Sequence, residues 1–164
     1  MGTTYLIKAY IPKWKSKHTI KTVIQSELER YSAIVSTYSP DSEISKFNQS
    51  QSTDWQPASK EIIFLLEMSK RLYTLSQGYW DPTIWPLFEL WGFSTRTFKK
   101  PTQTELSNTL QSVGFDKIEF TKDTLRKTIP TLQLDFSSIA KGRGVDLVAA
   151  QLENLKYHYL VFII

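Results

Sequence analysis

Residues 117–155 read KIEFTKDTLRKTIPTLQLDFSSIAKGRGVDLVAAQLENL, and most of the evidence on fold class lies in this stretch. Apolar and β-branched residues form three short candidate strands, at 117–121, 125–128 and 132–136. A helix is expected to follow them, over residues 138–155. Consecutive strands without helices between them do not fit a doubly wound sheet, in which strands and helices alternate. The stretch therefore predicts an α+β fold, with a mixed or antiparallel sheet and packed helices.

The flanking sequence predicts further strands and helices. Strands are expected at 3–10, which is rich in β-branched and aromatic residues, and at 159–164, which is almost entirely apolar. Apolar residues at helical spacing predict one helix around 20–31 and another over 59–76. No repeat or linker divides the chain, so residues 1–164 are expected to form one unit.

The clearest helix start in the sequence is at Thr102. Thr102 and Glu105 form a T-x-x-E capping box, in which each side chain bonds to the backbone of the other residue. Gly114 is expected to close this helix, because a glycine commonly follows the last helical turn. The buried stripe of the helix is predicted to consist of Leu106, Leu110 and Val113.

Composition excludes several kinds of protein. The chain has 164 residues, a net charge of +4 and no cysteine, which rules out disulfides and thiolate metal sites. No apolar run is long enough to cross a membrane, and the N-terminus lacks the apolar region of a signal peptide. Lysines interleaved with Trp14 at 13–21 can bind nucleic acid, although a solvated connector explains them better.

Three segments look chemical, and the first is STYSPDSEISKFN at 36–48. Ser39 and Pro40 are a good N-cap and first helical residue, so a short helix should begin there. A helix start preceded by the ring of Tyr38 suits a planar, hydrogen-bonding ligand. The alternative is an ordinary capped turn. The polar residues of the segment are Asp41, Ser42, Glu43, Ser45 and Asn48.

The second segment is GYWDPTIWPLFELWGF, residues 78–93. Pro82 favours an extended backbone at Asp81, which fixes the direction of the carboxylate. Tyr79 and Trp80 precede this carboxylate, and further aromatic residues follow it. Such a group forms either a binding pocket with one placed acid or simply an aromatic core.

The third segment is LDFSSIAKGRGVD, residues 134–146. A strand is expected to lead through Ser137 into a helix whose first turns carry Lys141 and Arg143. Free N–H groups at a helix start, together with cations and small residues, can bind a phosphate. The pattern is neither a dinucleotide-binding glycine motif nor a P-loop, so helix packing with surface charge is the alternative.

Taken in this order, the three segments resemble the motifs of the ApbE-type FAD:protein FMN transferases. The resemblance implies an ApbE-like, T-fold-like domain that splits FAD and attaches FMN to a Thr of a target flavoprotein. AMP is released, and Mg²⁺ is required. The flavin-nucleotide contacts that it implies are Met1, Tyr38, Tyr79, Trp80, Asp81, Ser137, Lys141 and Arg143. It also implies that the backbone carbonyl of Ala140 is a Mg²⁺ ligand, which suits this hard cation.

The sequence departs from the family pattern at two places. Trp85 stands where the family usually has a Gly, so its indole either narrows the pocket or fills a neighbouring gap. The resemblance covers only the N-terminal portion of the domain, so the half that would complete the Mg²⁺ site is expected to be missing from residues 1–164. The strand at 159–164 is then expected to present an edge through which copies of the chain associate.

Three functions follow from these expectations. The first is an FAD:protein FMN transferase, impaired by the truncation. The second is a homologue that binds flavin nucleotide without catalysis. The third, independent of the resemblance, is a polyanion-binding or nucleic-acid-binding module, whereas the resemblance itself implies no nucleic-acid partner. The family usually works outside the cytoplasm, but the sequence does not decide the compartment.

Overall fold

The computed structural model describes residues 5–9, 11, 16–156 and 160–163. Six α-helices and two small antiparallel sheets occur within these residues, so the predicted α+β class is confirmed. Met1, Trp14 and the ends of both terminal strands that the sequence predicts lie outside the described residues. No helix in the described ranges is long and apolar enough to cross a membrane.

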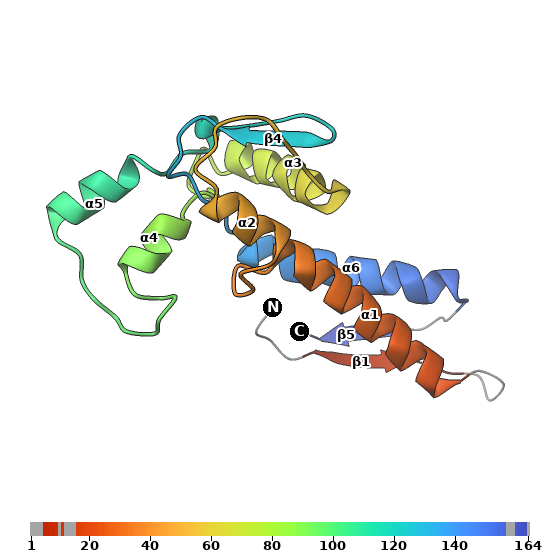
Figure 1. Cartoon of the computed structure of the whole chain (residues 1–164). Helices are drawn as coiled ribbons and strands as arrows, with labels where there is room; N and C mark the ends of the chain where they lie inside the picture. Colours follow the sequence, from red (N-terminus) through yellow and green to blue (C-terminus); the bar gives the residue numbers. More distant parts are fainter. Residues whose placement is uncertain (1–4, 10, 12–15, 157–159, 164) are drawn as a thin grey trace.

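Two long helices form one end of the molecule. The helix α1 (Lys17–Val35) packs along α6 (Ser137–Asn154), and the pair lies over the antiparallel strands β1 (Leu6–Ala9) and β5 (Leu160–Ile163) (Figure 1). Apolar residues one turn apart on each helix make this contact because they lie on one helical face. The small core between the two helices consists of Ile20, Ile24, Val148 and Leu152.

The main core lies between the end of α1, the second sheet and the segment before α6. That sheet has the order β2-β4-β3, and its strands are β2 (Gln56–Pro57), β3 (Ile118–Phe120) and β4 (Thr124–Lys127). Two helices contribute to the same core, α2 (Glu43–Gln49) and α3 (Lys60–Leu75). Burial of apolar side chains from these elements provides most of the free energy that holds them together. Among the fully buried side chains are Tyr31, Leu66, Leu132, Leu134 and Phe136.

The remaining helices form a separate lobe at one side of the molecule (Figure 1). They are α4 (Trp85–Leu90) and α5 (Gln103–Leu110), and they pack against each other. The predicted capping box of α5 is confirmed, with both reciprocal hydrogen bonds present. The predicted buried stripe is wrong, because α5 has no buried residue and Leu110 is 52% exposed. Trp85 fills a gap in this lobe, where its ring stacks on Phe88 at 5.3 Å.

Two expectations for local structure are wrong. Residues 132–136 are not a strand. The side chain of Asn48 is hydrogen-bonded to both the N–H and the carbonyl of Leu134, so these groups are not available to a neighbouring strand. The short helix begins after Ser42 rather than after Ser39, since the Ser42 hydroxyl accepts the N–H of Ser45. The same hydroxyl donates to the carbonyl of Ser36 and so fixes the turn between α1 and α2.

A buried lysine that no sequence pattern indicated links these elements. The Lys127 ammonium is completely buried and donates to the carbonyls of Phe47 and Leu132, each at 3.1 Å. Burial lowers the pKa of Lys127 to about 8. The carbonyl of Phe47 belongs to the last turn of α2, where a cation interacts favourably with the helix dipole.

Candidate functional site

Two of the three chemical segments meet at the start of α6. The indole N–H of Trp80 donates to the hydroxyl of Ser138 at 3.2 Å, and the backbone N–H of Asp135 donates to the carbonyl of Pro82 at 2.7 Å. These bonds join residues more than fifty positions apart in the sequence. The structure therefore brings the aromatic segment to the start of α6.

The Asp81 carboxylate is held by the surrounding backbone. One oxygen accepts from the N–H and hydroxyl of Thr83, at 2.8 and 2.6 Å, and the other accepts from the N–H of Phe115 at 3.0 Å. The Thr83 hydroxyl in turn accepts the N–H of Gly114 at 2.7 Å. This network fixes Trp80 and Pro82 relative to the rest of the fold. The position of the aromatic segment therefore depends on Asp81.

The first turn of α6 is capped from the loop before it. The Asp135 carboxylate accepts both the N–H and the hydroxyl of Ser137, at 2.9 and 2.5 Å. The N–H of Ser138 has no acceptor within the described part of the chain, and Ser137 and Ser138 are exposed. The start of an eighteen-residue helix thus offers a donor and a positive dipole end to solvent.

The two cations of this segment lie in different surroundings. Lys141 is exposed, and its ammonium has no hydrogen-bond or ion-pair partner among the described residues. The Nε of Arg143 instead donates to Glu61 at 3.2 Å, and its guanidinium lies 4.0 Å from the centre of the Phe64 ring. Two residues correspond to about 200° around an α-helix, so adjacent cations of this spacing point to opposite sides. The structure therefore brings Arg143 to α3.

The two tyrosine rings that are predicted to stack on the ligand are exposed and do not contact Trp80. Tyr38 is 65% exposed in the turn between α1 and α2, and Tyr79 is 95% exposed beside Trp80. No ring contact among the described residues joins either of them to Trp80. Both rings are consequently free to contact a ligand.

Most polar residues near Tyr38 have structural partners instead. The hydroxyl of Ser45 donates to the Ser36 carbonyl at 3.2 Å, and Glu43 accepts the N–H of Ser59 at 2.7 Å, at the start of α3. Asn48 exchanges two hydrogen bonds with Leu134. No local sequence pattern indicates these roles. The capped-turn alternative describes most of the polar residues in this segment better than a ligand site does.

The described residues do not form a complete magnesium site. Ala140 is buried in the first turns of α6, and its carbonyl is the single donor that the resemblance assigns within this chain. No three His, Asp or Glu side chains in the described ranges lie close enough to share a metal ion. Because Mg²⁺ needs near-octahedral coordination by oxygen, one carbonyl does not fit it on its own.

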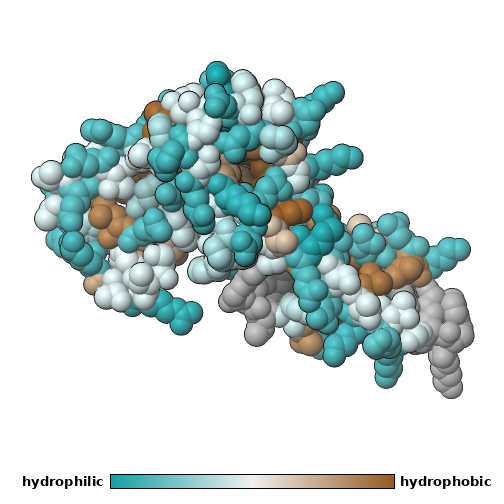
Figure 2. Space-filling model, viewed as in Figure 1, coloured by the Kyte–Doolittle hydropathy of each residue, from teal (hydrophilic) through white to brown (hydrophobic). Residues whose placement is uncertain are grey.

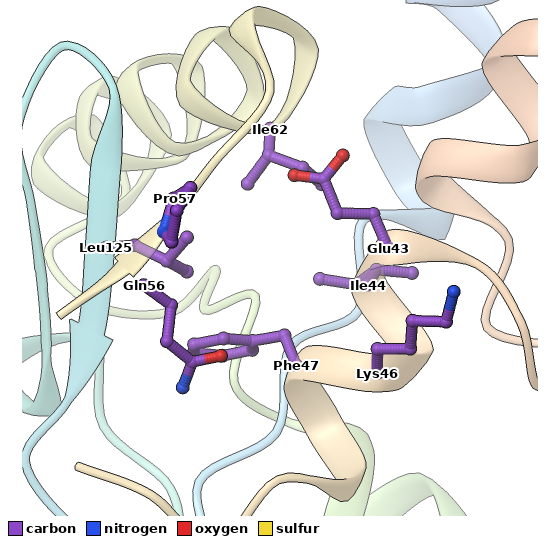
Figure 3. A pocket seen from close by; sticks show the side chains of 8 residues that line it. All are labelled: Glu43, Ile44, Lys46, Phe47, Gln56, Pro57, Ile62 and Leu125. Atoms are coloured by element: carbon purple, nitrogen blue, oxygen red, sulfur yellow. The ribbon is translucent and has the colours of Figure 1, made fainter. Parts of the chain in front are cut away.

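A pocket of about 160 Å³ lies on another part of the surface, between α2, α3, β2 and β4 (Figure 3). Its walls are apolar side chains, including Ile44, Phe47 and Leu125. Figure 3 shows the ammonium of Lys46 at the rim, turned away from the other side chains. None of the predicted site residues lines this pocket. It is a packing gap between α2 and the sheet.

The similarity to known proteins extends over the whole chain. A protein-family profile described as the ApbE family matches residues 1–163. The chain is 40% identical over 158 residues to the FAD:protein FMN transferase of Vibrio cholerae, a match that covers 94% of this chain and 47% of that protein. A protein of the same name from Haemophilus influenzae is 38% identical over 172 residues, with 98% and 49% covered.

Solved structures give the same answer. The flavin transferase ApbE from Vibrio cholerae superposes with a TM-score of 0.94 at 36% identity, covering 100% of this chain and 54% of that chain. The flavinyl transferase ApbE from Pseudomonas stutzeri, in its apo form, gives a TM-score of 0.92 at 30% identity, covering 99% and 53%. The chain spans about half the length of the curated relatives it matches. With its sequence and fold in agreement, this chain belongs to the ApbE family.

Proposed function

We propose that this chain provides the flavin-nucleotide site of an FAD:protein FMN transferase. The observation that supports the proposal most is the pair of bonds between the aromatic segment and the start of α6, Trp80 to Ser138 and Asp135 to Pro82. The indole of Trp80 thus lies at a helix N-terminus, and the exposed ring of Tyr79 precedes it in the sequence. A flavin nucleotide carries a planar ring system and a pyrophosphate, which these two features suit.

In this proposal the chain acts by positioning. The N–H of Ser138 and the ammonium of Lys141 bind phosphate oxygens, because a helix start and a free cation both favour negative charge. Tyr38 and Tyr79 stack on the flat heterocycles, an interaction worth about 1–3 kcal/mol per ring. Phosphoryl transfer depends mostly on such positioning and on neutralising phosphate charge. The acceptor is a Thr hydroxyl of a flavoprotein.

The proposal assigns the remaining residues by resemblance. By resemblance, the flavin nucleotide is also contacted by Met1, Asp81 and Ser137. The contact that the resemblance implies for Arg143 is not carried over, because its guanidinium faces Glu61 and Phe64 on α3. The Ala140 carbonyl would be one ligand of Mg²⁺, with the others coming from beyond the described residues. Mg²⁺ would neutralise phosphate charge during transfer. A homologue that binds flavin nucleotide without catalysis is the second candidate, and the absence of an acid cluster among the described residues favours it for residues 1–164 used alone.

Titration calorimetry with FAD tests the proposal. We expect the wild-type chain to bind FAD, and the Lys141→Ala variant to bind it about tenfold more weakly, since a charge-assisted contact contributes about 1.5 kcal/mol. Lys70→Ala is the matched control, because Lys70 is an exposed lysine on α3. Absence of FAD binding, or equal losses in both variants, would refute the site. Release of AMP from FAD in the presence of Mg²⁺ then separates the transferase from the inactive homologue.

A further inference from the structure

We propose that the loop between α4 and α5, residues 91–101, is the docking surface for the acceptor protein and that it binds an acidic segment bearing apolar side chains. The inference rests on the proposed function, because a protein-modifying enzyme needs a second surface that recognises its macromolecular substrate. Four features of the α4–α5 lobe support this proposal. They are a row of stacked aromatic rings that reaches the surface, a loop backbone held by its own hydrogen bonds, positive charge without an acidic partner, and closeness to the proposed nucleotide site.

An aromatic ladder runs from the interior of this lobe to its surface. The ring centroids of Trp85 and Phe88 are 5.3 Å apart, those of Phe88 and Phe93 are 5.1 Å apart, and those of Phe93 and Phe98 are 4.7 Å apart. The exposed fraction rises from 9% at Trp85 to 69% at Phe98. Aromatic anchors of this kind dominate the free energy of many protein interfaces. The ladder presents such an anchor on a buried base.

Hydrogen bonds within the loop backbone hold its aromatic residues in place. The N–H of Thr97 donates to the Gly92 carbonyl at 3.1 Å, and the N–H of Phe93 donates to the Phe88 carbonyl at 3.1 Å. Gly92 has a φ of +76°, and a Cβ atom there would lie 1.8 Å from the Thr97 carbonyl oxygen. Only glycine permits this approach. A loop already ordered before binding loses little conformational entropy when a partner docks.

The charge of the loop favours an acidic partner. Residues 91–101 include three cations and no acid. Lys99 is paired with Glu105 at 2.9 Å, whereas Arg96 and Lys100 are exposed and have no ionic partner in the part of the chain that the structure describes. Cations around an apolar centre steer and orient an acidic partner. An acidic segment with apolar side chains matches both properties.

The lobe also lies next to the proposed nucleotide site. Its first helix begins at Trp85, two residues after Thr83, whose hydroxyl is bonded to Asp81. Exposed apolar side chains gather over this part of the chain, and Figure 2 shows hydrophobic atoms among hydrophilic ones at the surface of the lobe. An acceptor held here stays near the bound nucleotide. The exposed members at the lobe are Ile84, Phe93, Phe98 and Leu110.

Fluorescence anisotropy with two labelled peptides tests the surface. The first is a twelve-residue peptide of Asp and Leu with one Thr, and the second has Lys in place of each Asp. We expect the acidic peptide to bind the wild-type chain, Phe98→Ser to weaken binding at least tenfold and Lys100→Gln about threefold. Leu75→Ser is the matched control, since Leu75 is 82% exposed at the end of α3. Circular dichroism and thermal unfolding check that each variant is folded.

The results separate the docking surface from the nucleotide site. Unchanged FAD affinity in Phe98→Ser, together with lost peptide binding, supports the surface. The surface proposal is overturned if the acidic peptide does not bind, if Phe98→Ser binds it as the wild type does, or if the Lys peptide binds equally well. The surface proposal is also overturned if vesicles of phosphatidylserine and phosphatidylcholine bind the chain in place of the peptide and this binding depends on Phe98. Failure of the wild-type chain to bind FAD is a different result, which refutes the proposed function.

Discussion

The polar and charged groups on the two sides of α6 differ in whether they have protein partners. On one side, the Lys141 ammonium and the backbone N–H of Ser138 face solvent with no protein partner among the described residues. On the other side, Arg143 contacts Glu61 and the ring of Phe64, and Glu61 also accepts from Arg30 at 3.4 Å. The first arrangement leaves donors available for a ligand, whereas the second uses them to join α1, α3 and α6.

Burial explains which polar groups of the chain have protein partners. Groups that face the interior are matched by partners, because an unpaired buried donor or acceptor costs about 1–3 kcal/mol. The described exceptions include the Tyr31 hydroxyl, which is buried beside the Arg143 ion pair without a partner. Groups that face the proposed site carry no such requirement, since water satisfies them until a ligand arrives. Variants on the two sides should therefore change different quantities.

The largest effect is expected from the interior side, at Asn48. The amide of Asn48 donates to the Leu134 carbonyl at 2.9 Å and accepts the Leu134 N–H at 2.8 Å. Asn48→Ala leaves both buried backbone groups unpaired, so we expect the free energy of unfolding to fall by about 3 kcal/mol. Urea denaturation followed by circular dichroism measures it. A loss below about 0.5 kcal/mol would contradict the structural role of Asn48.

The next effect is on the pH dependence of stability. Because burial lowers the pKa of Lys127 to about 8, the unfolded chain binds more protons than the folded chain between about pH 8 and 10.4. Stability should therefore rise with pH in this window, by at most about 1.4 kcal/mol per unit. Above about pH 10 the trend should reverse, because burial raises the pKa of Tyr31 and only the unfolded chain releases that proton.

Urea midpoints measured from pH 7 to 11 test this prediction. The Lys127→Met variant is the control, because it removes the titrating group and should lose the rise between pH 8 and 10. A flat wild-type profile, or a rise that survives in Lys127→Met, would show that another group is responsible.

The sequence predicted the elements better than the partners of their side chains. The capping box at Thr102 and the helix over 59–76 depend on local spacing, which a sequence displays directly. The role of Asn48 depends on Leu134, which is 86 positions away, and no local pattern reveals such a contact. The burial of Lys127 could not be anticipated either. Lysine is almost never fully buried unless its ammonium has partners, and one partner here, the Phe47 carbonyl, is 80 positions away.

The candidate site shows the same limit. The sequence marks segments 78–93 and 134–146 as candidate site segments, but no sequence pattern predicts their contact through Trp80 and Ser138. The direction of each cation on α6 could have been found by applying helical geometry, since Lys141 and Arg143 cannot share one face. The neighbours of Arg143 on α3 could not, because they come from a distant part of the chain.

A moderate effect on stability alone is expected at Arg143. Arg143→Ala removes a partly buried ion pair with Glu61 and a contact with the Phe64 ring, so stability should fall by about 1 kcal/mol. The FAD dissociation constant should change less than twofold, because the guanidinium faces α3. Thermal unfolding and calorimetry on the same sample measure both. A tenfold loss of FAD affinity would instead favour the nucleotide contact that the family resemblance implies.

The smallest effect should appear at Ser138, on the solvent side. Its hydroxyl is exposed and accepts the Trp80 indole N–H at 3.2 Å, so Ser138→Ala should change stability by no more than about 0.5 kcal/mol. The same variant releases the Trp80 ring, and loss of one hydrogen bond worth about 0.7 kcal/mol should weaken FAD binding about threefold. Ser138→Thr keeps the hydroxyl and should restore the affinity. If Ser138→Ala and Ser138→Thr bind FAD equally well, the bond to Trp80 does not organise the site, and the two sides of α6 would differ less than their partners suggest.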